Sequence, residues 1–235
     1  MQKIRKSRRT IFRRIFKPGW LYLLSRSLKP LSHNFGSNRG EPIDRYYIEK
    51  FLSENKGLIK GACLEIDDNF YTKKFGDNIL KSDVLDINKN NDKANIRADL
   101  RNAPEINDHE YDCIILTQVL QFIDEYESTI KECRRILKPG GTLLATLPSI
   151  SRIDVRAGTK GDYWRFTHAS AEFIFSKFFD KNSLEIKSRG NVLVGTAFWV
   201  GMAREELSLK KLDYNDPDFP VIITVRAKNS IFEHA

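Results

Sequence analysis

Short apolar runs alternate with helix-like segments between residues 41 and 227, and this alternation constrains the fold more than any other feature of the sequence. The predicted strands cover residues 62–66, 82–87, 95–98, 112–116, 142–147, 184–188 and 221–227. Helical spacing of apolar residues predicts helices over 42–56, 128–137, 167–179 and 192–207. Strands that alternate with helices indicate an α/β fold with a mostly parallel sheet and helices on both faces.

Positive charge is concentrated at the start of the chain. Residues 1–40 hold eleven Lys or Arg and no Asp or Glu, whereas the whole chain has a formal net charge of +8. Residues 41–235 are therefore slightly acidic, and binding to nucleic acid would depend on the first segment alone. Phe12, Ile15 and Phe16 share one helical face beside basic residues. We predict that residues 1–40 form a basic amphipathic arm. This arm either lies on an anionic membrane surface, docks on the acidic body of the chain or on a protein partner, or stays a solvated tail.

Other bulk features bear on location and metal content. No run of 18 apolar residues is present, so we expect no transmembrane helix. Cys63, Cys113 and Cys133 lack the spacing of metal ligands and are expected to be reduced, and we expect no metal site. These features predict a cytoplasmic protein, either free or peripheral at the inner membrane surface.

Polar side chains follow four of the predicted strands, where a parallel sheet binds its ligands. In chain order these residues are Asp67, Asp68, Asn69, Asp86, Asp99, Thr117, Gln118 and Gln121, with Leu100 beside Asp99. Carboxylates and amides suit a ligand with hydroxyls, an amine and a positive charge. Asp and Asn also cap helices and turns at such positions, so spacing alone leaves both interpretations open. We expect Gln121 to face the substrate.

Three segments then carry a resemblance to a known family. Residues 63–69 (Cys-Leu-Glu-Ile-Asp-Asp-Asn), 111–123 and 135–146 resemble, in order and spacing, the first, fourth and fifth motifs of class I S-adenosylmethionine-dependent methyltransferases of the type 11 group. The resemblance covers roughly residues 41–227, and we predict residues 41–235 as one domain. It implies a Rossmann-like fold with an antiparallel last strand, and S-adenosylmethionine as cofactor. Residues 161–167 further resemble a sub-branch found beside enzymes of sugar-polymer biosynthesis, which implies a small-molecule or glycan-type acceptor.

The resemblance also implies a role in cofactor binding for the residues at the strand ends. By position they are Glu65, Asp67, Asp68 and Asn69 at the methionine end, Asp86 or, less well placed, Asp83 at the ribose hydroxyls, Asp99 and Leu100 at the adenine, and Thr117 and Gln118 beneath the sulfonium.

Two features depart from the family pattern. Asp67, Asn69 and Tyr71 stand where the family has a glycine-rich turn, whose glycines permit positive φ and a close approach to the ligand. Asp and Asn tolerate left-handed turns, but Tyr71 does not fit this explanation. Residues 88–94 are too few for a crossover helix, which with its loops needs about a dozen residues. We therefore expect that helix to be lost and the adenine side to be more open.

A second group of residues is expected to handle the acceptor. Methylation of a hydroxyl needs a base, and Asp162 and His168 are the candidates, although a turn residue and a surface residue of a helix are the plainer interpretations. Tyr163 and Trp164 either form an aromatic wall against a sugar or pack in the core. Arg165 either holds an anionic group of the acceptor or pairs with Asp162.

The sequence therefore favours a methyltransferase that acts at oxygen on a small-molecule or glycan-type acceptor. The alternative is a non-catalytic scaffold of the same fold, because the glycine-rich turn is degraded. Methylation of nucleic acid is disfavoured, since no Asn-Pro-Pro-Tyr-like element lies near Thr117. A dinucleotide oxidoreductase is disfavoured because no Gly-x-Gly-x-x-Gly follows the first strand.

Overall fold

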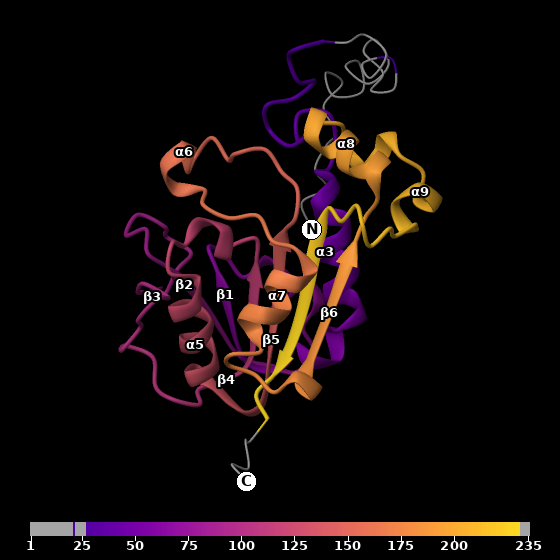
Figure 1. Cartoon of the computed structure of the whole chain (residues 1–235). Coiled ribbons are helices and arrows are strands. Elements are labelled where there is room, and N and C mark those ends of the chain that lie inside the picture. The colour runs from indigo at the N-terminus through magenta and orange to yellow at the C-terminus, as the bar shows by residue number, and fades with distance from the viewer. Residues whose placement is uncertain (1–20, 22–26, 231–235) are drawn as a thin grey trace. The chain divides into compact units, whose positions relative to one another are not determined.

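The computed structural model describes residue 21 and residues 27–230, which fall into two compact units (Figure 1). The helical unit comprises Met1–Glu49, Ile150–Arg152 and Ser188–Ile222, and the sheet unit comprises Lys50–Ser149, Ile153–Lys187 and Ile223–Ala235. Most of the predicted basic arm, residues 1–20 and 22–26, lies outside the described residues. The domain boundary at residue 40 therefore stays a prediction.

The sheet has seven strands in the order β3-β2-β1-β4-β5-β7-β6. Their bounds are β1 Gly61–Ile66, β2 Ile79–Asp86, β3 Ile96–Arg97, β4 Tyr111–Thr117, β5 Leu137–Pro148, β6 Leu184–Arg189 and β7 Ile222–Lys228. The pairs β1–β2, β1–β4, β2–β3 and β4–β5 are parallel, and β7 runs in the opposite direction between β5 and β6 (Figure 1). The predicted Rossmann-like fold with an antiparallel last strand is confirmed.

Three of the four predicted helices are shorter than the sequence predicts, whereas the one predicted over 128–137 begins at Tyr126 and is slightly longer. The helices of the described residues follow in chain order. They are α3 Ile43–Glu54, α4 Phe70–Phe75, α5 Tyr126–Ile136, α6 Gly158–Gly161, α7 His168–Phe175, α8 Val192–Val200 and α9 Leu209–Asp213. Short 3-10 turns lie at η1 Lys56–Leu58, η2 Leu120–Phe122, η3 Lys181–Ser183 and η4 Arg204–Glu206. The helix predicted to reach residue 207 ends at Val200, because Gly201 takes a left-handed φ of +81° that terminates it.

The loop between β2 and β3 contains no helix, as its length predicts. The two strands nevertheless pair in parallel, with Leu85 opposite Ile96 and Asp86 opposite Arg97. Asn95 contributes to this junction, because its Oδ1 accepts a hydrogen bond of 2.7 Å from the Val84 amide. A short loop thus replaces the crossover helix.

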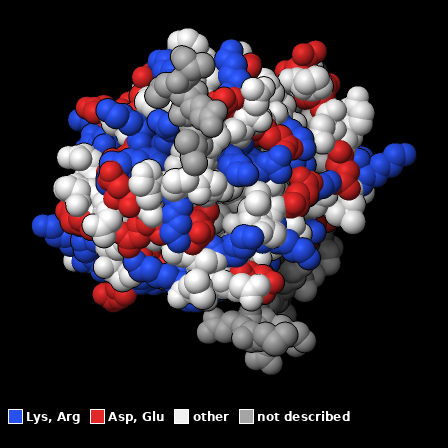
Figure 2. Space-filling model, turned by 90° about the horizontal axis from the view of Figure 1, so that it is seen from below, with Lys and Arg blue, Asp and Glu red and all other residues white. Residues whose placement is uncertain are grey.

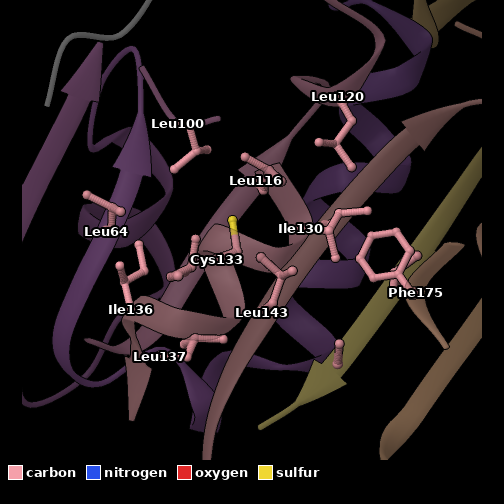
Figure 3. Packing of buried hydrophobic residues seen from close by; sticks show 14 of the residues in the cluster. Leu64, Leu100, Leu116, Leu120, Ile130, Cys133, Ile136, Leu137, Leu143 and Phe175 are labelled. Carbon is pink, nitrogen blue, oxygen red and sulfur yellow. The ribbon is translucent and has the colours of Figure 1, made fainter. Parts of the chain in front are cut away.

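The core of the sheet unit lies between the sheet and helices α5 and α7 (Figure 1). Leu64, Leu116 and Leu143 of the strands belong to one buried cluster with Ile130 of α5 and Phe175 of α7, and Figure 3 shows these side chains. All five side chains are buried. Since burying one such side chain contributes about 1.5–3 kcal/mol, this layer fixes the ends of β1 and β4 in register.

The described residues carry charge of both signs and no helix long and apolar enough to cross a membrane. On the face seen in Figure 2, Lys and Arg side chains are interspersed with Asp and Glu.

Candidate functional site

Two residues with left-handed backbone directly follow two neighbouring strands. Asp67 after β1 has a φ of +71°, and Gln118 after β4 has a φ of +54°. For residues other than glycine such a conformation costs on the order of 1–3 kcal/mol, and strained positions of this kind concentrate at functional sites. Because β1 and β4 are adjacent in the sheet, the two turns mark one edge as the candidate site. The expectation that Asp67 can take over the left-handed turn is met, whereas Asn69 has an ordinary φ of −104°.

Glu65 is occupied by the start of α4. Its buried carboxylate accepts hydrogen bonds from the amide of Tyr71 at 3.0 Å and from the amide and hydroxyl of Thr72, both at 2.8 Å. Burial raises the pKa of Glu65, and these hydrogen bonds oppose the rise. The Glu65 side chain therefore shapes the turn after β1.

Tyr71 poses no conflict with the turn, because it belongs to the first turn of α4. Its buried ring lies between the rings of Phe70 and Phe75, with centroid distances of 5.2 and 6.3 Å. The position that holds glycine in the family is here a helical core residue.

Asp68 and Asn69 lie beside this turn and are half-buried. Asp68 accepts a hydrogen bond from the Phe70 amide at 3.1 Å and forms an ion pair with Lys93 at 3.1 Å. The Asn69 amide donates to the hydroxyl of Ser82 at 3.2 Å. Both side chains are thus fixed around the exposed Asp67.

Asp86 is the last residue of β2, and its carboxylate accepts only two hydrogen bonds from the described residues. One oxygen accepts the Asn88 amide at 2.8 Å, and the other accepts Nδ2 of Asn91 at 2.7 Å. The same Nδ2 donates to the carbonyl oxygen of Asp67 at 2.7 Å, so Asn91 joins the ends of β1 and β2. An ionised carboxylate offers about four acceptor positions, so two remain for a ligand.

Asp83, the weaker alternative, is fully engaged inside the fold. It is buried and accepts hydrogen bonds from Tyr111 at 2.7 Å, Asn95 at 2.8 Å and Lys81 at 2.7 Å. Burial alone would raise the pKa of Asp83, but these three donors together bring it below its ordinary value. Asp83 therefore stabilises the sheet rather than facing a ligand.

Asp99 and Leu100 follow β3 and are also committed to protein contacts. The Asp99 carboxylate forms an ion pair with Arg101 at 2.7 Å, and this guanidinium lowers the pKa of Asp99. The Leu100 side chain is part of the hydrophobic core (Figure 3). Only their backbone is left to contact an adenine.

Gln121 connects the end of β4 to the segment that carries Tyr163 and Trp164. Its Nε2 donates to the carbonyl oxygen of Gln118 at 2.9 Å, and its own carbonyl oxygen accepts the amides of Tyr163 at 2.7 Å and Trp164 at 3.3 Å. Its Oε1 is buried without a hydrogen-bond partner among the described residues. An unsatisfied buried acceptor lowers the stability of a protein by about 1–3 kcal/mol, so a ligand group that donates a hydrogen bond to this oxygen would recover that free energy. Thr117, the last residue of β4, is half-buried beside this turn.

Asp162 and Arg165 form a two-pronged ion pair. The guanidinium approaches the two carboxylate oxygens at 2.6 and 3.0 Å, and the Asp162 side chain is only 2% exposed. One of these oxygens also accepts the Asp154 amide at 2.9 Å. Of the two interpretations of Arg165, pairing with Asp162 is the one the contacts fit, and both residues hold the loop of residues 153–166 in place.

The aromatic residues of this loop divide between core and surface. Phe166 is buried against Tyr126, whereas Tyr163 and Trp164 are exposed. The Trp164 ring is nonetheless held, because its Nε1 donates to the carbonyl oxygen of Ile123 at 2.9 Å and its ring lies perpendicular to that of Tyr126, with 5.1 Å between the centroids. The loop lies beyond the end of the sheet at which β1 and β4 end (Figure 1).

His168 is the first residue of α7, and its side chain is exposed. Thr167 precedes it as the N-cap, and its hydroxyl accepts the Ser170 amide at 3.1 Å while the Ser170 hydroxyl accepts the Thr167 amide at 2.9 Å. This reciprocal cap fixes the start of α7 at the end of the loop.

Sequence reasoning missed Asn91 and Lys93, which bond the loop of residues 88–94 to the strand ends. The amide-rich run Asn88-Lys89-Asn90-Asn91-Asp92 was the available signal, since Asn side chains often bond nearby backbone. The partner atoms of Asn91 lie on two different strand ends, which the run itself does not specify.

Comparisons with known proteins agree with this geometry. A model of the methyltransferase domain family matches residues 71–145, which include most of the motif at 111–146 but not the one at 63–69. No curated protein matches the sequence.

Solved structures share the fold at low sequence identity. A S-adenosylmethionine-dependent methyltransferase from Archaeoglobus fulgidus has a TM-score of 0.51 and 12% identity, over 78% of this chain and 94% of that chain. The N-methyltransferase NodS from Bradyrhizobium japonicum, solved with S-adenosyl-L-homocysteine, has a TM-score of 0.50 and 15% identity, over 80% and 88%. The [4+2]-cyclase SpnF has a TM-score of 0.54 and 14% identity, over 96% and 97%. The chain thus matches the methyltransferase-domain model over residues 71–145 and has the fold of the class I S-adenosylmethionine-dependent methyltransferases.

Proposed function

We propose that the protein transfers a methyl group from S-adenosylmethionine to an oxygen atom of a small-molecule or glycan-type acceptor. The observation that carries the proposal is the Asp86 carboxylate, which keeps two acceptor positions at the end of β2 beside the left-handed turn of Asp67. A cyclase among the neighbours means that the fold alone does not select the reaction. The domain match and these residues together favour methyl transfer.

The residues present fit the cofactor at its ribose. Two acceptor positions on one carboxylate match the two neighbouring hydroxyls of a ribose, and hydrogen bonds to a charged acceptor are among the stronger ones. Asn91 and Asn88 hold the Asp86 carboxylate in one orientation. Asp83 is poorly suited to bind the ribose hydroxyls, because its carboxylate already accepts hydrogen bonds from three donors of the protein.

At the methionine end, we assign Asp67, Asp68 and Asn69 to the amine of the cofactor and Thr117 and Gln118 to the floor of the site. When bound, S-adenosylmethionine supplies a methyl group already activated by a positively charged sulfonium. The chain therefore has mainly to position the two reactants and to surround a cation with carboxylates.

Glu65 acts on this end indirectly, since its carboxylate holds the first turn of α4. Asp99 and Leu100 remain our proposed neighbours of the adenine, through their backbone, because Arg101 pairs with the Asp99 carboxylate and the core contains the Leu100 side chain.

The loop of residues 153–166 is our proposed acceptor side. The exposed rings of Tyr163 and Trp164 offer a flat apolar surface to a sugar, and Oε1 of Gln121 offers an unsatisfied acceptor for a hydroxyl. A hydroxyl loses its proton on methylation, and His168 is the exposed group that can accept it. Asp162 and Arg165 act as positioning residues, because each carboxylate oxygen already faces the guanidinium.

A non-catalytic scaffold is the second candidate, and one observation favours it. Asn91 donates to both the Asp67 carbonyl and the Asp86 carboxylate, and Lys93 pairs with Asp68, so the loop of residues 88–94 is bonded across the strand ends. If that loop fills the ribose position, the fold persists without cofactor binding.

Isothermal titration of the full chain with S-adenosylhomocysteine separates the two candidates. The enzyme requires saturable binding in the micromolar range, whereas absence of heat at millimolar ligand would favour the scaffold. Transfer of labelled methyl from S-adenosylmethionine is then measured with pairs of sugars that differ only in a hydroxyl or an amine at one carbon. Label on the hydroxyl sugars supports the proposal, and label confined to the amino sugars contradicts the assignment to oxygen.

A further inference from the structure

The helical unit carries an apolar helix that is only half covered. Helix α8 has the sequence Val-Leu-Val-Gly-Thr-Ala-Phe-Trp-Val, without a charged residue. Val194, Gly195, Ala197 and Phe198 are buried on one side. A helix that is apolar all round is normally buried on every side, so the other face of α8 calls for an explanation.

The uncovered face of α8 is continuous and apolar. At 3.6 residues per turn, Val192, Leu193, Thr196 and Trp199 fall on adjoining positions of one side, and all four are exposed. Val192 is 56% and Trp199 is 52% exposed. The hydroxyl of Thr196 is turned back to the Val192 carbonyl oxygen at 2.8 Å, so its methyl group completes the face. We call these four residues the α8 face.

Residues 31–36 are fixed to the end of this helix. The Leu31 amide donates to the Val200 carbonyl oxygen at 2.8 Å, and the Phe35 ring stacks on Phe198 at 5.8 Å. The contact is close, because a Cβ on Gly201 would lie 2.5 Å from the carbonyl oxygen of Ser32. Residues 31–36 are therefore packed against the C-terminal end of α8.

The segment that leads into this contact is strongly basic. Residues 1–29 contain ten Lys or Arg and no Asp or Glu. Because the Leu31 amide is bonded to the Val200 carbonyl oxygen, this basic sequence joins the described structure at the end of α8, next to Trp199.

We propose that the α8 face docks the protein on an anionic lipid bilayer, whose headgroups attract the Lys and Arg side chains of the sequence that leads into it. A bilayer interface offers both partners at once, since its acyl boundary takes apolar side chains and its anionic headgroups attract Lys and Arg. A nucleic acid would satisfy the charge but leave the α8 face in water. A second copy would bring two segments of ten positive charges together, which mutual repulsion opposes.

The contact is peripheral for the part of the chain that the structure describes, since no helix there can span a membrane. Trp199 suits this depth, because its ring is apolar and its indole N–H is polar, a combination that settles at membrane interfaces. The proposal is independent of the methyltransferase reaction and of the cofactor site.

Cosedimentation of the full chain with vesicles tests the proposal. Binding should be at least about tenfold stronger to phosphatidylcholine vesicles with one third phosphatidylglycerol than to phosphatidylcholine alone. The triple variant Val192→Ser, Leu193→Ser, Trp199→Ser should lose about tenfold or more in affinity for the anionic vesicles. Phe173→Ser, which removes an exposed aromatic residue from α7 in the sheet unit, is the matched control and should bind as the wild type does.

A second measurement avoids dependence on the triple variant. With Trp20 and Trp164 replaced by Phe, Trp199 is the one remaining tryptophan of the chain. Its fluorescence should shift to shorter wavelength and be quenched by brominated lipids when anionic vesicles are added. Absence of quenching in bound protein would overturn the assignment of the α8 face.

Three other outcomes would also overturn the proposal. They are equal binding to neutral and anionic vesicles, a wild-type dimer that the triple variant converts to a monomer in light scattering, and binding to RNA in preference to anionic vesicles.

Discussion

Replacing Asp86 by Ala should weaken the binding of S-adenosylhomocysteine by about 30- to 700-fold. The carboxylate has two acceptor positions left after its bonds to Asn88 and Asn91, and we assign both to the ribose hydroxyls. A hydrogen bond to a charged group contributes about 1.5–3 kcal/mol, and the freed hydroxyls recover part of this by bonding to water. A net loss of about 2–4 kcal/mol at about 1.4 kcal/mol per tenfold gives the stated range.

Two further variants separate the carboxylate from its surroundings. Asp86→Asn keeps one oxygen but loses the charge, so an intermediate loss of about tenfold is expected. Asp92→Ala removes the same charge from the exposed loop next to Asn91 and serves as the matched control, with affinity within about twofold of the wild type.

Isothermal titration at fixed ionic strength gives the dissociation constants, and thermal melts verify that each variant is folded. Folded Asp86→Ala protein that binds within about threefold of the wild type would refute the ribose assignment. An equal loss in Asp92→Ala would show that net charge, rather than contact, controls affinity.

The remaining predictions concern stability and the acceptor loop. Tyr111→Phe should destabilise the fold by about 1–3 kcal/mol in urea melts at pH 7, because it removes one donor from the buried Asp83 carboxylate. The pKa of Asp83 is lowered in the folded state, so its stabilisation is present above its unfolded-state pKa of about 3.9 and is lost as pH falls through the folded value. The difference between Tyr111→Phe and wild type should therefore shrink toward pH 2, and an unchanged difference would contradict this account. Asp162→Asn should weaken the ion pair with Arg165, speed proteolysis within residues 153–166 and raise KM for the acceptor, while S-adenosylhomocysteine binding stays within about twofold. Equal proteolysis rates would argue against a positioning role. Trp164→Ala should raise KM for the acceptor about tenfold with little change in cofactor affinity, measured by initial rates, and a selective loss of cofactor binding would contradict its assignment to the acceptor side.

Much of the sheet could be predicted because local patterns control it. Apolar runs such as residues 112–116 are too hydrophobic for the surface, and their alternation with helical segments leaves few topologies besides a parallel sheet. The motif at 111–146 identified the strand and helix that frame the site, and the family match covers most of it. Helix ends were less predictable, since α8 stops at Gly201 through one left-handed residue in an apolar run that continues.

The sequence predicted where the candidate site lies, but it did not predict which role each of its residues has. Asp83 and Asp86 have the same side chain and lie on the same strand, yet one is buried under three donors and the other keeps two acceptor positions. Tyr71, which looked incompatible with the turn, lies in a helix that Glu65 caps. The role of each residue therefore depends on which donors from distant parts of the chain form hydrogen bonds with its carboxylate.

By itself, the sequence determined the α/β class, the strand ends as the candidate place for ligands, the methyltransferase resemblance and the concentration of basic residues at the start. The tertiary structure alone decided that Asn91 joins Asp67 to Asp86 and that residues 31–36 lie against the end of α8. The physical reason is that hydrophobic periodicity is local and can be read along the chain, whereas hydrogen bonds and buried contacts join residues far apart in it and depend on angstrom-scale geometry.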